Sequence, residues 1–309
     1  MAKILAVCIS EKKGVQKHNV GQARLIADWG LENDAHAGKW HRQVSLLSME
    51  KIEAFNQRGA GVAYGAFGEN IVADIDFRAL PVGTWLRCGD ALLEITQIGK
   101  QCHHGCAIFQ KMGDCIMPRE GVFAKVLQGG TIQVGDALVI EPRQGKRPYQ
   151  AAVITLSDKG ARGERQDASG PAVVKRLQAA AYEIAETLLL PDGLHPLEEE
   201  LKRLADQRQV DLILTTGGTG LTSRDVTPEA TLAVAERTVP GIAEAIRAYS
   251  MAITPRAMFS RGASVIRGKT LIINLPGSPK AVEESLDAFL KDLPHALDML
   301  RGESGDCAR

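Results

Sequence analysis

The 309-residue sequence carries no net charge and has no apolar run long enough to cross a membrane. With 37 basic and 37 acidic side chains, it lacks the bulk charge by which proteins attract nucleic acids or anionic lipids. The apolar run near the start, residues 2–9, is far below the ~20 residues that span a bilayer, and no small-residue cleavage site follows it. We therefore expect a cytoplasmic protein with no nucleic-acid or membrane partner, whose anionic ligands are held locally.

Cysteine is also scarce, whereas glycine is plentiful. Six cysteines are too few for a disulfide scaffold at this length, and without an export signal we expect them to be thiols. Three of the six fall between Cys102 and Cys115. The 31 glycines exceed the usual share of about 7% and predict several turns of special backbone geometry.

The length predicts two domains of about 150 residues each. Residues 141–148 combine two prolines, a glycine and four charges, which is typical of a linker. We place one domain at 1–144 and the other at 149–309. The first half has short β-type runs separated by turns and predicts a β-rich domain with a helix over 48–58.

The second half alternates strands with helices. Apolar runs at 151–156, 188–190, 210–214 and 270–275 are separated by segments with helical spacing of apolar residues. This pattern predicts a three-layer α/β domain with a mostly parallel sheet. In such sheets, ligands bind at the carboxyl ends of the strands.

Four loops follow these strands and are rich in groups that bind anions. We expect helices to begin after them, capped by Ser169 or Gly170, by Thr227 and by Ser278. Glycines allow backbone N–H groups to approach a phosphate, and helix N-termini favour negative charge. The candidate binding residues in these loops are Ser157, Gly217, Gly218, Thr219, Gly220, Arg224, Asn274, Pro276, Gly277, Ser278 and Lys280.

The charged residues of these loops suggest a metal-assisted site. Lys280 lies in a first helical turn, where the helix dipole disfavours a cation unless an anion is near. Asp192 and Asp225 are carboxylates in a site otherwise arranged for anions, and Mg²⁺ bound to phosphates would reconcile the two. Structural roles stay open for each: Asp225 as a residue that fixes a turn, Lys280 as a solvated charge. Neither a Walker motif nor Gly-x-Gly-x-x-Gly is present, which excludes the ordinary P-loop and Rossmann sites.

Three motifs in the second half carry a family resemblance. TTGGTG at 215–220, RDVTPEA at 224–230 and NLPGSPK at 274–280, with Pro191 and Asp192 upstream, resemble the molybdopterin adenylyltransferases of molybdenum cofactor biosynthesis. The resemblance covers 149–302. It implies transfer of AMP from Mg-ATP to the terminal phosphate of molybdopterin, with Asp192 and Asp225 as catalytic, Mg²⁺-binding residues, and a trimer. The short segment after Lys280 lacks an insertion that some members carry, which leaves open a storage role.

The cysteines of the first half admit three interpretations. Lys100, His103 and His104 beside Cys102 would lower the pKa of its thiol and favour a nucleophile or soft-metal ligand. Cys102 and Cys106 also have the Cys-x3-Cys spacing of zinc sites, with Cys115 as a third ligand. Inert buried cysteines are the third possibility.

The first half also resembles a known domain. DAHAG at 34–38, HRQVSL at 41–46, GENI at 68–71 and the segment from Cys102 are similar to the MOSC domain, the β-rich module of molybdenum cofactor sulfurases and amidoxime-reducing enzymes, and we expect a barrel of that type. The resemblance implies that Cys102 binds molybdenum or carries sulfur. Arg42, Asn70 and Arg119 are the candidate cofactor-binding residues; surface ion pairs are the alternative for the two arginines.

Together, these features predict a bifunctional protein of molybdenum cofactor biosynthesis. Its C-terminal domain would adenylylate molybdopterin, and its N-terminal domain would bind the molybdenum cofactor or deliver sulfur through Cys102. The alternatives are a non-catalytic cofactor carrier and a molybdenum-dependent redox enzyme. The implied partners are molybdopterin, ATP, a molybdenum insertase or sulfur donor, and further copies of the chain.

Overall fold

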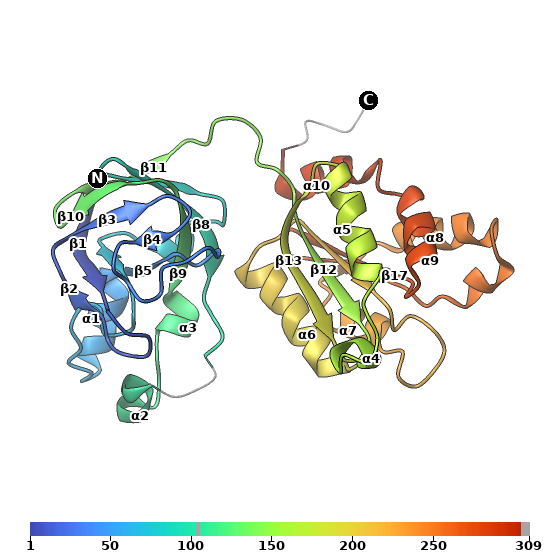
Figure 1. Ribbon diagram of the computed structural model, residues 1–309, viewed down its shortest axis with the longest axis horizontal. Coiled ribbons are helices and arrows are strands. Elements are labelled where there is room, and N and C mark those ends of the chain that lie inside the picture. The colour runs from blue at the N-terminus through green and yellow to red at the C-terminus, as the bar shows by residue number, and fades with distance from the viewer. Residues whose placement is uncertain (103–105, 304–309) are drawn as a thin grey trace. The chain divides into compact units, whose positions relative to one another are not determined.

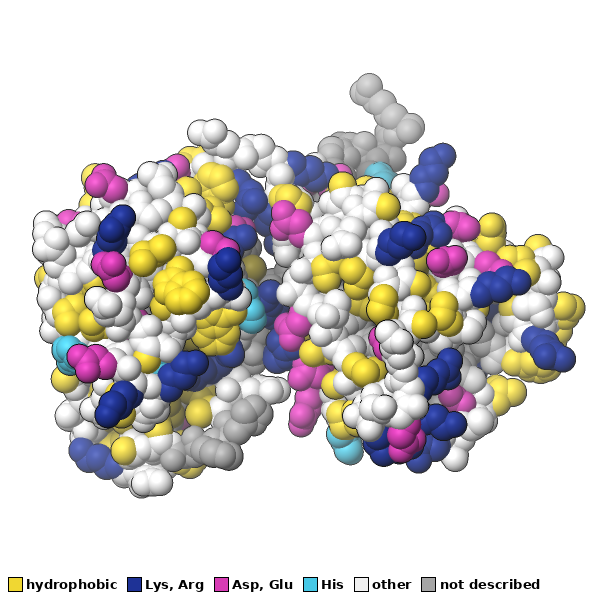
Figure 2. All heavy atoms as spheres, in the orientation of Figure 1, with side chains coloured by type: hydrophobic (Ala, Val, Ile, Leu, Met, Phe, Trp, Pro, Cys, Tyr) yellow, Lys and Arg dark blue, Asp and Glu magenta, His cyan; other side chains and the backbone are white. Residues whose placement is uncertain are grey.

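The computed structural model describes residues 1–102 and 106–303. The chain forms two compact units, Met1–Arg147 and Pro148–Arg309 (Figure 1). Basic and acidic side chains are interspersed on the visible face of both units (Figure 2). None of the helices in the described ranges is long and apolar enough to cross a bilayer.

The N-terminal unit is a closed β-barrel, which confirms the predicted architecture. The ring runs through β1 (Ala2–Ile9), β11 (Ala137–Glu141), β7 (Trp85–Cys88), β8 (Ala91–Ile98), β9 (Val122–Gln128), β5 (Val44–Ser48) and β6 (Ile71–Ala73), which pairs with β1 again. Within the ring, β5 and β6 are parallel and the remaining pairs are antiparallel. Closure removes the exposed sheet edges through which strands aggregate.

Smaller elements decorate this barrel. β2 (His18–Asn19) pairs with β1, and β10 (Gly130–Gln133), β3 (Gln22–Ile26) and β4 (Gly30–Leu31) form a second sheet. The helical elements are α1 (Met49–Gln57), η1 (Phe77–Ala79), α2 (Ala107–Met112) and α3 (Met117–Glu120).

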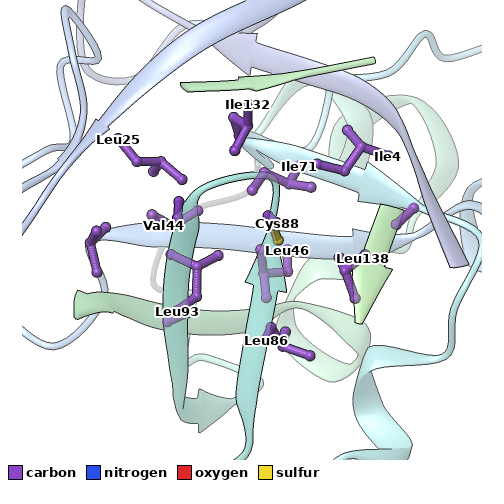
Figure 3. Packing of buried hydrophobic residues seen from close by; sticks show 14 of the residues in the cluster. Ile4, Leu25, Val44, Leu46, Ile71, Leu86, Cys88, Leu93, Ile132 and Leu138 are labelled. Carbon is purple, nitrogen blue, oxygen red and sulfur yellow. The ribbon is translucent and has the colours of Figure 1, made fainter. Parts of the chain in front are cut away.

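Strand β5 shows how the barrel builds two apolar cores. Val44 and Leu46 point into the barrel with Leu93 and Leu138 (Figure 3). Leu47, on the opposite face, packs with residues of α1, α2 and α3 outside the barrel. Because side chains alternate along a strand, the consecutive residues Leu46 and Leu47 are buried on opposite faces.

The C-terminal unit contains the predicted mostly parallel sheet. Its order is β13 (Glu183–Leu190), β12 (Gln150–Leu156), β14 (Leu212–Thr216), β17 (Thr270–Leu275), β16 (Ser264–Arg267) and β15 (Arg237–Thr238). The first four strands are parallel, and β16 runs antiparallel to β17 and β15. Because β13 and β14 flank β12, the order reverses there and places the ligand-binding switch point at the carboxyl ends of β12 and β14.

Helices cover both faces of this sheet, which confirms the three-layer arrangement (Figure 1). One core includes residues of α5 (Ser169–Ala179), α8 (Pro240–Met251), α9 (Pro279–Asp287) and α10 (Leu293–Arg301). The opposite core includes residues of α6 (Leu194–Lys202), η2 (Arg203–Gln207) and α7 (Thr227–Ala233). Two short elements, α4 (Asp158–Ala161) and η3 (Pro255–Phe259), lie in connecting segments.

Two predicted helix caps are wrong and one is confirmed. Asp167, rather than Ser169 or Gly170, caps α5, because its Oδ1 accepts from the backbone N–H groups of those two residues at 2.9 and 3.0 Å. Thr227 is the first residue of α7, and its hydroxyl donates to the carbonyl of Gly217 at 2.9 Å. Ser278 caps α9 as expected, accepting from the N–H of the third helical residue at 3.3 Å.

Candidate functional site

Three of the four predicted loops are in direct contact at the carboxyl end of the sheet. A Cβ added to Gly217 would lie 2.5 Å from the carbonyl oxygen of Leu156, and one added to Gly277 would lie 3.3 Å from the Cα of Gly217. The Ser169 hydroxyl donates to the carbonyl of Gly277 at 2.7 Å. Only glycine allows backbones to approach this closely.

The third loop presents backbone donors. Gly217 and Gly218 adopt φ values of +99° and +63°, in the region that glycine alone enters readily. Within residues 1–102 and 106–303, the N–H groups of Gly218 and Thr219 donate to no protein acceptor. Successive N–H groups in such a turn form a concave binding site for an anion.

Asp192 exchanges hydrogen bonds with Asp158, a residue of the first loop. The backbone N–H of Asp158 donates to Oδ2 of Asp192, and the N–H of Asp192 donates to Oδ1 of Asp158, both at 3.1 Å. Asp158 also pairs with the guanidinium of Arg224. This chain of contacts joins the first three loops and brings Asp192, Arg224 and the neighbouring Asp225 into one area.

Asp225 is a preformed anion. Its Oδ2 accepts from the hydroxyl of Thr222 at 2.7 Å and from the backbone N–H of the same residue at 2.8 Å. These hydrogen bonds, the hydroxyl's first, hold the pKa of Asp225 below its usual value, because they favour the charged form. The carboxylate is therefore ionised at neutral pH.

The remaining candidates of this half occupy different environments. Ser157 caps α4 by accepting from the N–H of Gly160 at 3.1 Å. Asn274 is buried and donates to the hydroxyls of Thr215 and Thr231 at 2.9 and 2.8 Å, so it cross-links the sheet to α7. The Pro276 carbonyl accepts from the Thr216 hydroxyl at 2.7 Å.

Lys280, by contrast, extends into solvent. Its side chain is 84% exposed and its Nζ lies 3.8 Å from a carboxylate oxygen of Glu284, one helical turn away. An exposed pair of this kind contributes little stability. Lys280 is therefore available to a ligand at the start of α9.

A cavity of about 410 Å³ in the N-terminal unit collects several predicted residues. Cys102, Arg42 and Asn70 line it, together with Lys17, His36, Lys100, Cys106 and Cys115. Arg42 stacks over Trp40, with 4.7 Å from the guanidinium carbon to the ring centroid. Asn70 is buried and donates to the carbonyl of Cys8 at 3.0 Å.

Arg119 lies in an ion pair instead. Its Nη1 and Nη2 donate to the two carboxylate oxygens of Asp114 at 3.0 and 3.2 Å, and it is absent from the cavity lining. Arg119, with help from Arg58, holds the pKa of Asp114 well below its usual range. The structure thus gives Arg119 the ion-pair environment that was the alternative to phosphate binding.

The three neighbouring cysteines differ in exposure. Cys102 and Cys106 are exposed and Cys115 is buried, and burial raises the pKa of the Cys115 thiol to about 11. In the part of the chain that the structure describes, no group of three or more histidine, cysteine or acidic side chains is placed to hold a metal ion. His103 and His104 lie outside the described residues.

Buried ionisable side chains lie next to the residues that line this cavity. Lys17 and Asp34 form an ion pair at 2.8 Å with side chains only 1% and 0% exposed. Glu69 accepts from the backbone N–H groups of Gly65 and Phe67 at 2.6 and 3.0 Å, and burial raises its pKa to about 7. Burial, with the nearby cation of Lys17, lowers the pKa of His36, so His36 is neutral at neutral pH and the basic lining comes from lysine and arginine.

Comparisons with known proteins agree with the two units. The family model described as "Probable molybdopterin binding domain" matches residues 152–295, and the MOSC domain model matches residues 33–139. The molybdopterin adenylyltransferase of Escherichia coli K12 is 44% identical over 165 residues, covering 48% of this chain and 84% of the relative.

Two further proteins match the same half. The molybdopterin adenylyltransferase of Haemophilus influenzae is 44% identical over 137 residues, which cover 44% of this chain and 70% of the relative. The crystal structure of the molybdopterin biosynthesis enzyme MoaB from Thermus thermophilus is 48% identical, with a TM-score of 0.48, covering 50% of this chain and 97% of that one. By its C-terminal unit this chain therefore belongs to the molybdopterin adenylyltransferase family, and its N-terminal unit is a MOSC domain.

Proposed function

We propose that the C-terminal unit transfers AMP from Mg-ATP to the terminal phosphate of molybdopterin and releases pyrophosphate. The observation that carries this proposal is the meeting of glycine-rich loops and carboxylates at the switch point of the sheet. The names of the relatives support the same chemistry. Molybdenum cofactor biosynthesis is the process in which this activity belongs.

The reaction brings together two anions that repel each other. The site must therefore neutralise both phosphates and align them for in-line attack. The N–H groups of Gly218 and Thr219 and the exposed cation of Lys280 are suited to bind phosphate oxygens. Arg224 would exchange its partner Asp158 for a phosphate.

Asp192 and Asp225 fit a magnesium ion. Both carboxylates lie on loops at the sheet edge. Of the two carboxylate oxygens of Asp192, only Oδ2 accepts a hydrogen bond from the described residues, which leaves Oδ1 for a ligand. Magnesium prefers such hard oxygen ligands together with substrate phosphates. When bound, it would supply positive charge against the triphosphate.

The test is pyrophosphate release from ATP and molybdopterin by carboxylate variants. We expect Asp225→Asn and Asp192→Asn to lose about 100-fold or more, the loss typical of electrostatic groups at a reaction centre. Asp287→Asn is the matched control, because Asp287 pairs with Arg176 on the surface between α5 and α9. Full activity in Asp225→Asn would contradict the assignment.

We also propose that the N-terminal cavity binds the molybdenum cofactor or a sulfur-bearing form of it through Cys102. The exposed thiol, the basic side chains of Lys100 and Arg42, and the volume of the cavity support a phosphorylated, thiophilic ligand. Such a unit would exchange cargo with a molybdenum insertase or a sulfur-donor protein.

Molybdenum content tests the role of Cys102. The full chain is purified from cells supplied with molybdate, and molybdenum is measured by elemental analysis. We expect Cys102→Ser to lose the metal and Cys106→Ser, an exposed neighbour in the same cavity, to retain it. Equal molybdenum in wild type and Cys102→Ser would contradict the proposal.

We further propose that the chain assembles as a homo-oligomer, a trimer by family resemblance. α8 and η3 contact each other. These two elements and the segment between them expose apolar side chains to solvent, namely Tyr249, Met251, Ile253, Met258 and Phe259. Several exposed apolar side chains on neighbouring elements are typical of an interface, and further copies of this chain are the proposed occupants.

A further inference from the structure

Arg261 contacts the glycine-rich third loop at several points. It lies between η3 and β16, and its backbone N–H donates to the carbonyl of Thr219 at 3.1 Å. Its Nε donates to the carbonyl of Gly220 at 2.7 Å, and its Nη2 donates to the carbonyl of Asp225. The guanidinium also pairs with the carboxylate of Glu229 in the first turn of α7. One side chain therefore joins both ends of the exposed turn to the helix behind it.

The turn from Gly220 to Asp225 depends on this attachment. Residues 221–224 are exposed, so apolar burial does not fix them. The hydrogen bonds between Thr222 and Asp225 shape the turn from within, and Thr227 anchors the loop at Gly217. Among the described residues, Arg261 supplies the side-chain anchor at Gly220 and at the backbone of Asp225.

The guanidinium group of Arg261 is suited to holding the turn in one position. Hydrogen bonds from a guanidinium are roughly twice as strong as those between neutral groups, and its planar fork fixes direction as well as distance. The two carbonyls and the carboxylate that it bridges lie on different segments. Movement of the turn would have to break several of these bonds together.

We propose that Arg261 positions Asp225 and Arg224 for adenylyl transfer by holding the turn between them and Gly220. The proposal rests on the proposed function of the C-terminal unit and adds a residue that touches no substrate. A misplacement of about 1 Å at a reacting centre can cost about 100-fold in rate. Loss of Arg261 should therefore lower kcat and raise the Mg²⁺ requirement, with little change in the KM for ATP.

Three variants of the full chain test this role. Arg261→Gln removes the charge and most contacts, and Arg261→Lys keeps the charge without the fork. Arg267→Gln is the matched control, because Arg267 also binds a carboxylate, Asp206, at 2.8 Å and a backbone carbonyl, that of Val234, at 3.1 Å, but none in the third loop. Amide hydrogen exchange over residues 217–225 is measured without substrates, and pyrophosphate release is measured against Mg²⁺ and ATP.

For Arg261→Gln we expect exchange over residues 217–225 to be about tenfold faster or more, and kcat to fall about tenfold or more. Arg261→Lys should be intermediate, and Arg267→Gln should match wild type over this segment. If Arg261→Gln fails to fold, Arg261→Lys is judged by the same two readouts.

The proposal is overturned if the Arg261 variants have the same amide exchange over residues 217–225 and the same Mg²⁺ dependence as Arg267→Gln. Failure of the proposed function is separate: it would appear as absent pyrophosphate release in wild type, while the exchange experiment would still report whether Arg261 holds the turn.

Discussion

Gly217→Ala should destabilise the C-terminal unit far more than an ordinary glycine substitution. At φ +99°, a side chain costs about 1–2 kcal/mol in backbone strain. The new Cβ would also lie 2.5 Å from the carbonyl oxygen of Leu156, a backbone atom at the end of β12. Relief of that overlap requires backbone movement, worth about another 1–3 kcal/mol. The expected loss of unfolding free energy is therefore about 2–5 kcal/mol.

Gly163→Ala is the matched control. Gly163 has a φ of +73° and no heavy atom within 4 Å of an added Cβ, so it carries only the strain of about 1–2 kcal/mol. Most of the longer helices belong to the C-terminal unit, so its unfolding in urea is followed by circular dichroism at 222 nm. Trp29, Trp40 and Trp85 all belong to the N-terminal unit, and their fluorescence reports that unit separately.

The two variants should also differ in catalysis. Movement of Gly217 away from Leu156 would displace the N–H groups proposed to bind phosphate, so Gly217→Ala should lose pyrophosphate release while Gly163→Ala retains it. Equal unfolding free energies and equal activities of the two variants would refute the claim that the contact between Gly217 and Leu156 excludes a side chain.

Further predictions concern the N-terminal cavity and the exposed apolar surface. Between pH 4.5 and about 7 the unfolded state ionises Glu69 while the folded state keeps its proton, so the free energy of unfolding falls by about 1.4 kcal/mol for each unit that the pH rises. Glu69→Gln should flatten this slope in urea titrations followed by tryptophan fluorescence. An unchanged slope would contradict the burial of Glu69. Arg42→Ala should lose co-purifying molybdenum and Arg119→Ala should keep it, whereas the reverse result would refute the placement of the cavity. Phe259→Ser should lower the molar mass in light scattering toward the monomer, and an unchanged mass would exclude this surface.

The architecture of the C-terminal unit could be predicted because it follows from local patterns. Apolar runs separated by helical segments specify parallel strands with helical crossovers, and the motifs at 215–220 and 274–280 follow such strands. Contacts that depend on the pairing between strands could not be predicted in this way. Leu156 and Leu190 are register partners, which sets Asp158 beside Asp192, a contact visible only once the strand order is known.

Arg261 and Arg119 show a second reason why the roles of site residues could not be predicted from the sequence. Arg261 precedes an antiparallel strand, so a search for residues after parallel strands passes over it. Arg119 and Arg42 are equally plausible phosphate ligands by residue type, and only tertiary structure shows that Asp114 engages Arg119 whereas Arg42 lines the cavity. Long charged side chains select partners that are distant in sequence, which periodicity does not encode.

The most direct test is the stoichiometry of the reaction catalysed by the wild-type chain. ATP, Mg²⁺ and molybdopterin are mixed with the protein, and pyrophosphate and adenylylated molybdopterin are quantified by mass spectrometry and a coupled assay. We predict equal amounts of the two products and none without molybdopterin. Binding of molybdopterin and ATP with no pyrophosphate released would contradict catalysis and identify a cofactor carrier instead.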